Sequence, residues 1–145
     1  MTLPVPIPGL VINYSYLWWS EDRAGLDEGV KDRPCVIAAM RSLETRLLVA
    51  TVLPITHAVP KQSDEAVEMP PQLKAHLGLD GERSYVVVTE ANDFIWPGPD
   101  LRPVSRGKSG LFHFGVLPPR FFAHIRDLLL KMHSEARLKR VSRTS

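Results

Sequence analysis

The chain has 145 residues, which fits one domain of ordinary size with a single hydrophobic core. Hydrophobic residues make up 44% of it and charged residues 23%, which excludes the apolar-poor composition of a disordered chain. Eighteen Lys and Arg residues against 16 Asp and Glu residues leave a formal net charge of +2, so total charge gives no general affinity for nucleic acid. We therefore expect a single folded domain over residues 1–145.

The lone cysteine and the first residues bear on the cellular compartment. Cys35 has no second cysteine with which to form an internal disulfide, and residues 1–10 lack the basic and apolar regions of a signal peptide. The longest apolar runs are far shorter than the ~20 residues of a membrane-spanning helix. These features predict a cytoplasmic protein that does not bind a membrane. Cys35 lies in an apolar run, which predicts a buried, unreactive thiol.

Strands are predicted for most of the chain. Thirteen prolines and nine glycines exclude long helices before its last quarter. Between them lie five short runs, most of them rich in β-branched or aromatic residues, that predict strands over residues 10–17, 34–40, 46–54, 84–89 and 111–116. Short strands with turn-rich links predict a mainly β fold, a small barrel or a strongly bent sheet.

Three aromatic residues alternate along the first predicted strand. The spacing of Tyr14, Tyr16 and Trp18 places them on one strand face. Packing in the core is the favoured interpretation of this face, and stacking on nucleic-acid bases is the alternative.

Two helices are predicted. Residues 70–79 predict a short connecting helix, with Pro71 in its first turn and Gly78 at its end. Apolar residues then recur at three- and four-residue spacing from Phe121 to Met132, which predicts an amphipathic helix over about 118–138. We expect its apolar face to pack on a barrel formed by about 8–117. Residues 139–145 predict a frayed basic tail rather than an RNA-binding arm.

Two polar clusters flank the second and third predicted strands. Glu28 and Arg33 precede one strand, and Thr56 and His57 follow the other. If these strands pair as an antiparallel hairpin, Arg33 comes to face Thr56 and His57. A guanidinium, a hydroxyl, an imidazole and a carboxylate supply the proton transfers and charge stabilisation that metal-free RNA cleavage requires. On the residues alone, solvated surface side chains are the favoured interpretation, and a catalytic group is the alternative.

The histidines do not predict a metal site. None of the five has the His-Glu-x-x-His spacing, and only one cysteine is present. We therefore expect neither a metal nor another cofactor.

Several short motifs resemble the N-terminal half of the MazF/PemK toxins of type II toxin-antitoxin systems. They are Pro8-Gly9-Leu10-Val11-Ile12, Lys31-Asp32-Arg33-Pro34 and Leu53-Pro54-Ile55-Thr56. The later strands and the C-terminal helix extend the resemblance over about 8–133. It implies the SH3-like barrel of the MazF, PemK and CcdB plasmid-maintenance toxins, a homodimer, and ribonuclease activity that an acidic antitoxin inhibits.

The resemblance also implies roles for individual residues. The essential Arg and Thr of the family fall on Arg33 and Thr56, and a glutamate of some members falls on Glu28. His57 stands where many members carry Ser or Thr. The implied reaction is attack of the 2′-hydroxyl of single-stranded RNA on its own phosphate. Arg33 and Thr56 would stabilise the phosphate, and Glu28 and His57 would divide the proton transfers, with acid and base unassigned.

The same resemblance suggests how RNA is held and which alternatives remain. Tyr16, Trp18 and Trp96 are expected to stack on bases, and Lys31 and Arg102 to contact the RNA backbone. One alternative is a non-catalytic protein of the same fold that traps a DNA topoisomerase, and another is a toxin domain that now serves only for interaction. The presence of Arg33 and Thr56 argues against the first of these alternatives and leaves the second open.

Overall fold

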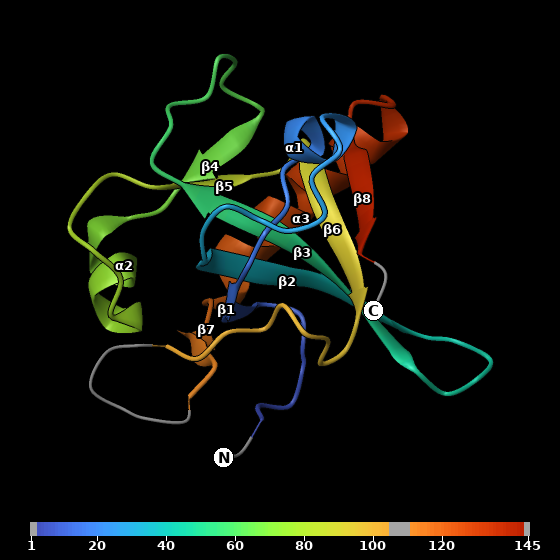
Figure 1. Cartoon of the computed structure of the whole chain (residues 1–145). Helices are drawn as coiled ribbons and strands as arrows, with labels where there is room; N and C mark the ends of the chain where they lie inside the picture. The colour runs from blue at the N-terminus through green and yellow to red at the C-terminus, as the bar shows by residue number, and fades with distance from the viewer. Residues whose placement is uncertain (1–2, 105–110, 144–145) are drawn as a thin grey trace.

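The computed structural model describes residues 3–104 and 111–143, which form a mainly β structure with a C-terminal helix (Figure 1). The expected fold class is confirmed at that level. In chain order the elements are β1 (Leu10–Tyr14), α1 (Trp19–Arg23), β2 (Arg33–Ser42), β3 (Leu48–Thr56), β4 (Ala66–Glu68), α2 (Pro71–Leu77), β5 (Tyr85–Val87), β6 (Glu90–Ile95), β7 (His113–Val116), α3 (Pro119–Ser134) and β8 (Lys139–Arg143).

The strands form one sheet around β3. Its main path runs β4-β5-β3-β2-β1-β7, while β6 also pairs with β3 and carries β8 on its other edge. Neighbouring strands are antiparallel except β6 and β8, which are parallel. Along one edge β3 pairs with β2, and along the other it pairs first with β6 and then with β5. Among the described residues β4 does not pair with β7, so the sheet is not closed.

Both faces of the central strands are buried. Strand alternation sends Val11, Val36 and Leu53 into a cluster that includes Ile125 and Met132 of α3. Figure 1 shows α3 behind the sheet on that side. The opposite cluster contains Leu10, Ile12, Tyr14, Tyr16, Cys35, Ile37, Ala50, Val52, Phe94 and Leu101. Burial on both faces explains why these strands are apolar in continuous runs.

Cys35 and the first strand agree with the sequence predictions, except that the strand is shorter than predicted. Cys35 is fully buried, and burial raises the pKa of its thiol, as expected. The five predicted strands correspond to β1, β2, β3, β5 and β7. The first strand ends at Tyr14 rather than at residue 17, although Tyr16 and Trp18 still pack with Tyr14 in one cluster. Core packing is thus the confirmed interpretation for Tyr14 and Tyr16.

Both predicted helices are present. Helix α2 ends before Gly78, which has a φ of 72°, and α3 buries Ile125 and Met132 as its periodicity predicts. Within the described residues, no helix is both long and apolar enough to cross a membrane.

The prediction of a frayed basic tail was wrong. Helix α3 ends at Ser134, and Lys139–Arg143 forms β8. Arg143 is buried, and its guanidinium donates to the Ser15 carbonyl oxygen at 2.8 Å and pairs with Asp100 at 3.0 Å. The prediction assumed that water solvates the basic side chains. For Arg143, a carbonyl oxygen and a carboxylate take the place of that water. Residues 144–145 lie outside the described part of the chain.

Candidate active site

The β2–β3 hairpin brings Arg33 to the same pocket as Thr56 and His57, as predicted, whereas Glu28 does not line that pocket. Cys35 lies opposite Pro54, and the same register two residues further places Arg33 opposite Thr56. Both residues line a pocket of about 480 Å³ at this end of the hairpin. The polar and charged residues of its wall are Asn13, Lys31, Asp32, Arg33, Thr56, His57, Lys74, Asp80 and Ser84.

Arg33 presents a positive charge that has no ion-pair partner among the described residues. Its Cζ atom lies 4.9 Å from the centre of the Trp18 ring, so the aromatic face holds the plane of the guanidinium. Its Nε atom is buried and has no hydrogen-bond partner. Among the described residues, no carboxylate lies within the 4.0 Å of an ion pair with Arg33. A cation in this state suits an anionic ligand.

Thr56 offers a hydroxyl on the facing strand. Its Oγ1 atom accepts a hydrogen bond from the Ala58 amide at 3.2 Å, which leaves the O–H group as a donor. Arg33 and Thr56 together therefore provide donors of the kind that bind a phosphate.

A glycine sets the path of the loop that leads to Arg33. A Cβ atom at Gly29 would collide with the backbone carbonyl oxygen of Tyr16. Only glycine therefore allows the loop to lie against this carbonyl and deliver Arg33 to the start of β2.

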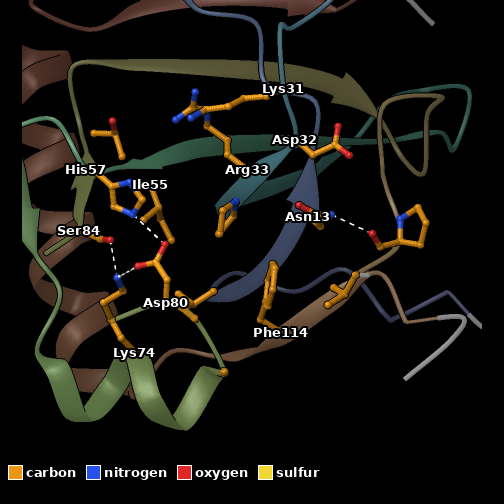
Figure 2. A pocket seen from close by; sticks show the side chains of 16 residues that line it. Asn13, Lys31, Asp32, Arg33, Ile55, His57, Lys74, Asp80, Ser84 and Phe114 are labelled. Atoms are coloured by element: carbon orange, nitrogen blue, oxygen red, sulfur yellow. Dashed lines mark hydrogen bonds and ion pairs between the residues drawn. The ribbon is translucent and has the colours of Figure 1, made fainter. Parts of the chain in front are cut away.

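A chain of hydrogen bonds forms the opposite wall of the pocket (Figure 2). His57 Nε2 lies 2.8 Å from Asp80 Oδ2, and Lys74 Nζ donates to Asp80 Oδ1 at 2.6 Å. The Lys74 ammonium also donates to Ser84 Oγ at 2.6 Å and to the Glu82 carbonyl oxygen. The Lys74 side chain is only 5% exposed, so these three acceptors replace its water.

The pKa of Asp80 reflects its position. Burial opposes ionisation, but hydrogen bonds from Lys74, the Glu82 amide and His57 outweigh it and lower the pKa below its ordinary value. Asp80 is thus held as a carboxylate next to His57.

The side chains of His57, Asp80 and Glu82 bring ligand-type atoms within 4.8 Å of one another. All three are exposed, and both oxygens of Asp80 are already engaged, one by Lys74 and one by His57.

The structure places the other charged candidates differently. Lys31 is exposed and lines the pocket. Glu28 is exposed in the preceding loop and is not one of the lining residues. Arg102 is also not part of the wall, and its guanidinium lies 3.6 Å from Asp32 and 3.9 Å from Asp100. It therefore balances the acidic charge at the pocket edge.

The aromatic candidates are separated. Tyr16 is 1% exposed and donates its hydroxyl proton to Glu90, so the structure contradicts base stacking by Tyr16. Trp18 is partly buried and lines a second pocket of about 240 Å³, which shares Thr56 with the first.

Trp96 is remote from both pockets. Its amide donates to the Leu48 carbonyl oxygen at the other end of β3, roughly 26 Å from Thr56 at the rise of a β-strand. The structure does not bring Trp96 to the site, because β6 runs antiparallel to β3 and ends at the hairpin turn.

The sequence analysis missed Lys74, Asp80 and Ser84. Lys74 follows Leu73 in a short helix, and Asp80 precedes Gly81, a pairing typical of a solvated turn. Their shared position depends on how α2 and β5 pack, for which the sequence carries no local signal.

The fold and this pocket define a mainly β protein with a polar pocket, lined by Arg33, at the end of a hairpin. Comparisons with models of protein families, with curated proteins and with solved structures find no match to the chain.

Proposed function

We propose that this protein is an endoribonuclease of the MazF/PemK toxin type, with the SH3-like barrel of that family, which cuts single-stranded RNA at the Arg33 pocket without a metal. One observation carries the proposal. Arg33 lacks a carboxylate partner among the described residues, has a buried Nε without a hydrogen-bond acceptor, and stands opposite the Thr56 hydroxyl in the hairpin register. An RNA phosphate supplies the negative charge that this arrangement lacks.

The reaction needs no group from outside the chain. The 2′-oxygen attacks the adjacent phosphorus while a base takes its proton, and the bond to the 5′-oxygen breaks as an acid protonates that oxygen. The products are a 2′,3′-cyclic phosphate and a 5′-hydroxyl. Arg33 and Thr56 stabilise the charge that develops on the phosphorane oxygens. His57 lines the pocket and Glu28 does not, so His57 is assigned the proton transfer nearest the phosphate.

Cleavage of a long single-stranded RNA in EDTA tests the proposal. Wild-type protein is expected to give fragments with cyclic phosphate ends, while Arg33→Ala prepared in parallel leaves the RNA intact. Arg126→Ala is the matched control, because it removes the same charge from an exposed position on α3. Intact RNA with the wild-type protein contradicts the proposal and favours a non-catalytic protein. Equal cutting by the wild-type protein and Arg33→Ala identifies a contaminating nuclease.

The same proposal includes two protein partners. An acidic antitoxin would place carboxylates on Lys31 and Arg33, where they compete directly with RNA. A second copy of the chain would form a homodimer. Light scattering measures the dimer, and RNA competition measures the antitoxin: a partner that binds together with RNA contradicts shared use of this pocket.

A further inference from the structure

His57 does not stand alone in the pocket, because Asp80 and the buried Lys74 lie behind it in one hydrogen-bonded row. We propose that Asp80 is a positioning residue that holds the neutral His57 ring with its proton on Nε2, and that Lys74 fixes Asp80 for this task. The inference deepens the proposed ribonuclease function and rests on it for its catalytic consequence. It assigns Nδ1 as the atom of His57 that exchanges a proton with RNA.

The tautomer follows from what a carboxylate can accept. His57 Nε2 lies 2.8 Å from Asp80 Oδ2, which is hydrogen-bond distance. An ionised carboxylate only accepts hydrogen bonds, so the nitrogen that faces it must carry the proton. In a neutral imidazole the other nitrogen, Nδ1, then carries the lone pair and acts as the base.

Lys74 determines which oxygen of Asp80 is left for His57. Asp80 Oδ1 accepts from the Lys74 ammonium at 2.6 Å and from the Glu82 amide at 3.1 Å. Oδ2 is therefore the oxygen that points to the imidazole. Since Lys74 is itself bound to Ser84 and to the Glu82 carbonyl oxygen, the carboxylate is tied to the backbone of its own turn. The row is rigid at its buried end and meets solvent at His57.

Other charged groups face the same space. Glu82 Oε2 lies 3.9 Å from His57 Nε2, beyond hydrogen-bond distance, and its side chain is 74% exposed. Lys31, Asp32 and Arg33 line the opposite part of the pocket. Glu82 is thus a carboxylate beside His57 that is not part of the row, and Glu82→Gln is the matched control for Asp80→Asn.

In Asp80→Asn, the group that faces His57 Nε2 changes from a hydrogen-bond acceptor to a donor. The Lys74 ammonium requires an acceptor and takes the amide oxygen, which turns the NH₂ group toward His57. Nε2 must then accept, so the proton moves to Nδ1. The variant keeps the shape of the site but presents the wrong tautomer, and its effect on stability is read from the Tm.

Nitrogen-15 NMR of His57 in RNA-free protein tests the tautomer independently of any activity. At a pH where the ring is neutral, the wild-type protein and Glu82→Gln are expected to carry the proton on Nε2, and Asp80→Asn on Nδ1. A wild-type ring with its proton on Nδ1, or no difference between wild type and Asp80→Asn, overturns the inference even if the protein cuts RNA.

Kinetics with single-stranded RNA in EDTA test the catalytic part. Asp80→Asn is expected to lower kcat by about a hundredfold or more with little change in KM, on the scale of a lost general acid or base. Glu82→Gln is expected to change kcat by less than about threefold, as for a surface substitution. An unchanged kcat in Asp80→Asn overturns the catalytic role. If the wild-type protein cuts no RNA, the proposed function and this catalytic role fail together, while the NMR result alone decides the positioning by Asp80.

Discussion

Replacement of Arg33 separates a role in catalysis from a role in folding. The guanidinium contacts the Trp18 ring at 4.9 Å, and a cation–π contact of this kind contributes about 0.5–2 kcal/mol to stability. In a chain of this size each kcal/mol corresponds to roughly 2–4 °C in Tm. Arg33→Ala is therefore expected to remain folded and to melt only a few degrees below the wild-type protein. The loss of Arg33 also removes its buried and unsatisfied Nε, which reduces the cost further.

The expected loss of activity is much larger. Removal of one donor that stabilises the charge of a transition state costs about 2.7–4 kcal/mol, which corresponds to roughly 10²–10³ in kcat. Arg33→Lys is also expected to be poor, because an ammonium does not reproduce the two-pronged contact of a guanidinium with phosphate. The assay is initial-rate cleavage of single-stranded RNA in EDTA, with thermal melts of each variant. Cleavage by Arg33→Ala at the wild-type rate refutes the assignment of the phosphate site.

Three further predictions concern the loop, the buried acid and the last strand. Gly29→Ala is expected to cost about 1–3 kcal/mol in thermal melts, because its Cβ meets the Tyr16 carbonyl oxygen, and to lower cleavage; an unchanged Tm contradicts this. Burial raises the pKa of Glu90 despite hydrogen bonds from Trp19 and Tyr16, so its contribution to stability is present at low pH and is lost as pH rises through that raised pKa; Glu90→Gln should gain Tm relative to wild type as pH rises above the ordinary glutamate value of 4.5, and a constant difference is the contrary result. Arg143→Ala is expected to cost about 1–3 kcal/mol in denaturant unfolding, since the Ser15 carbonyl oxygen loses its donor and Asp100 keeps only Arg102, at 3.9 Å; a loss near zero would instead support a frayed tail.

The elements predicted correctly are those whose signal is local. Strand β3 is a nearly continuous apolar run between turn residues, and α3 has an apolar period that fits a helix. Strands β4, β6 and β8 lie outside the five predicted strands. Strands β6 and β8 contain many polar residues, of which Asn92 and Arg143 are buried. Asn92 satisfies the Leu17 amide and carbonyl groups at 2.9 and 2.8 Å, so a buried amide replaces backbone pairing there. Because Asn92 and Leu17 are far apart in the sequence, the hydrophobic pattern does not predict these hydrogen bonds.

The candidate site also has one part that the sequence predicted and one part that it did not. Arg33 and Thr56 were predicted to meet because the hairpin register depends only on two adjacent strands and the turn between them. The row behind His57 depends instead on Lys74 from α2 and on Ser84, which directly precedes β5, so it requires the packing of elements beyond the hairpin. A lysine on a short helix is normally solvated, so its type and spacing point away from the interior. Its burial is energetically acceptable only because three acceptors converge on the ammonium, and those same contacts hold the carboxylate that faces His57. The burial of Lys74 and the proposed tautomer of His57 therefore both depend on Asp80, and a substitution that removes its side-chain oxygens disturbs both.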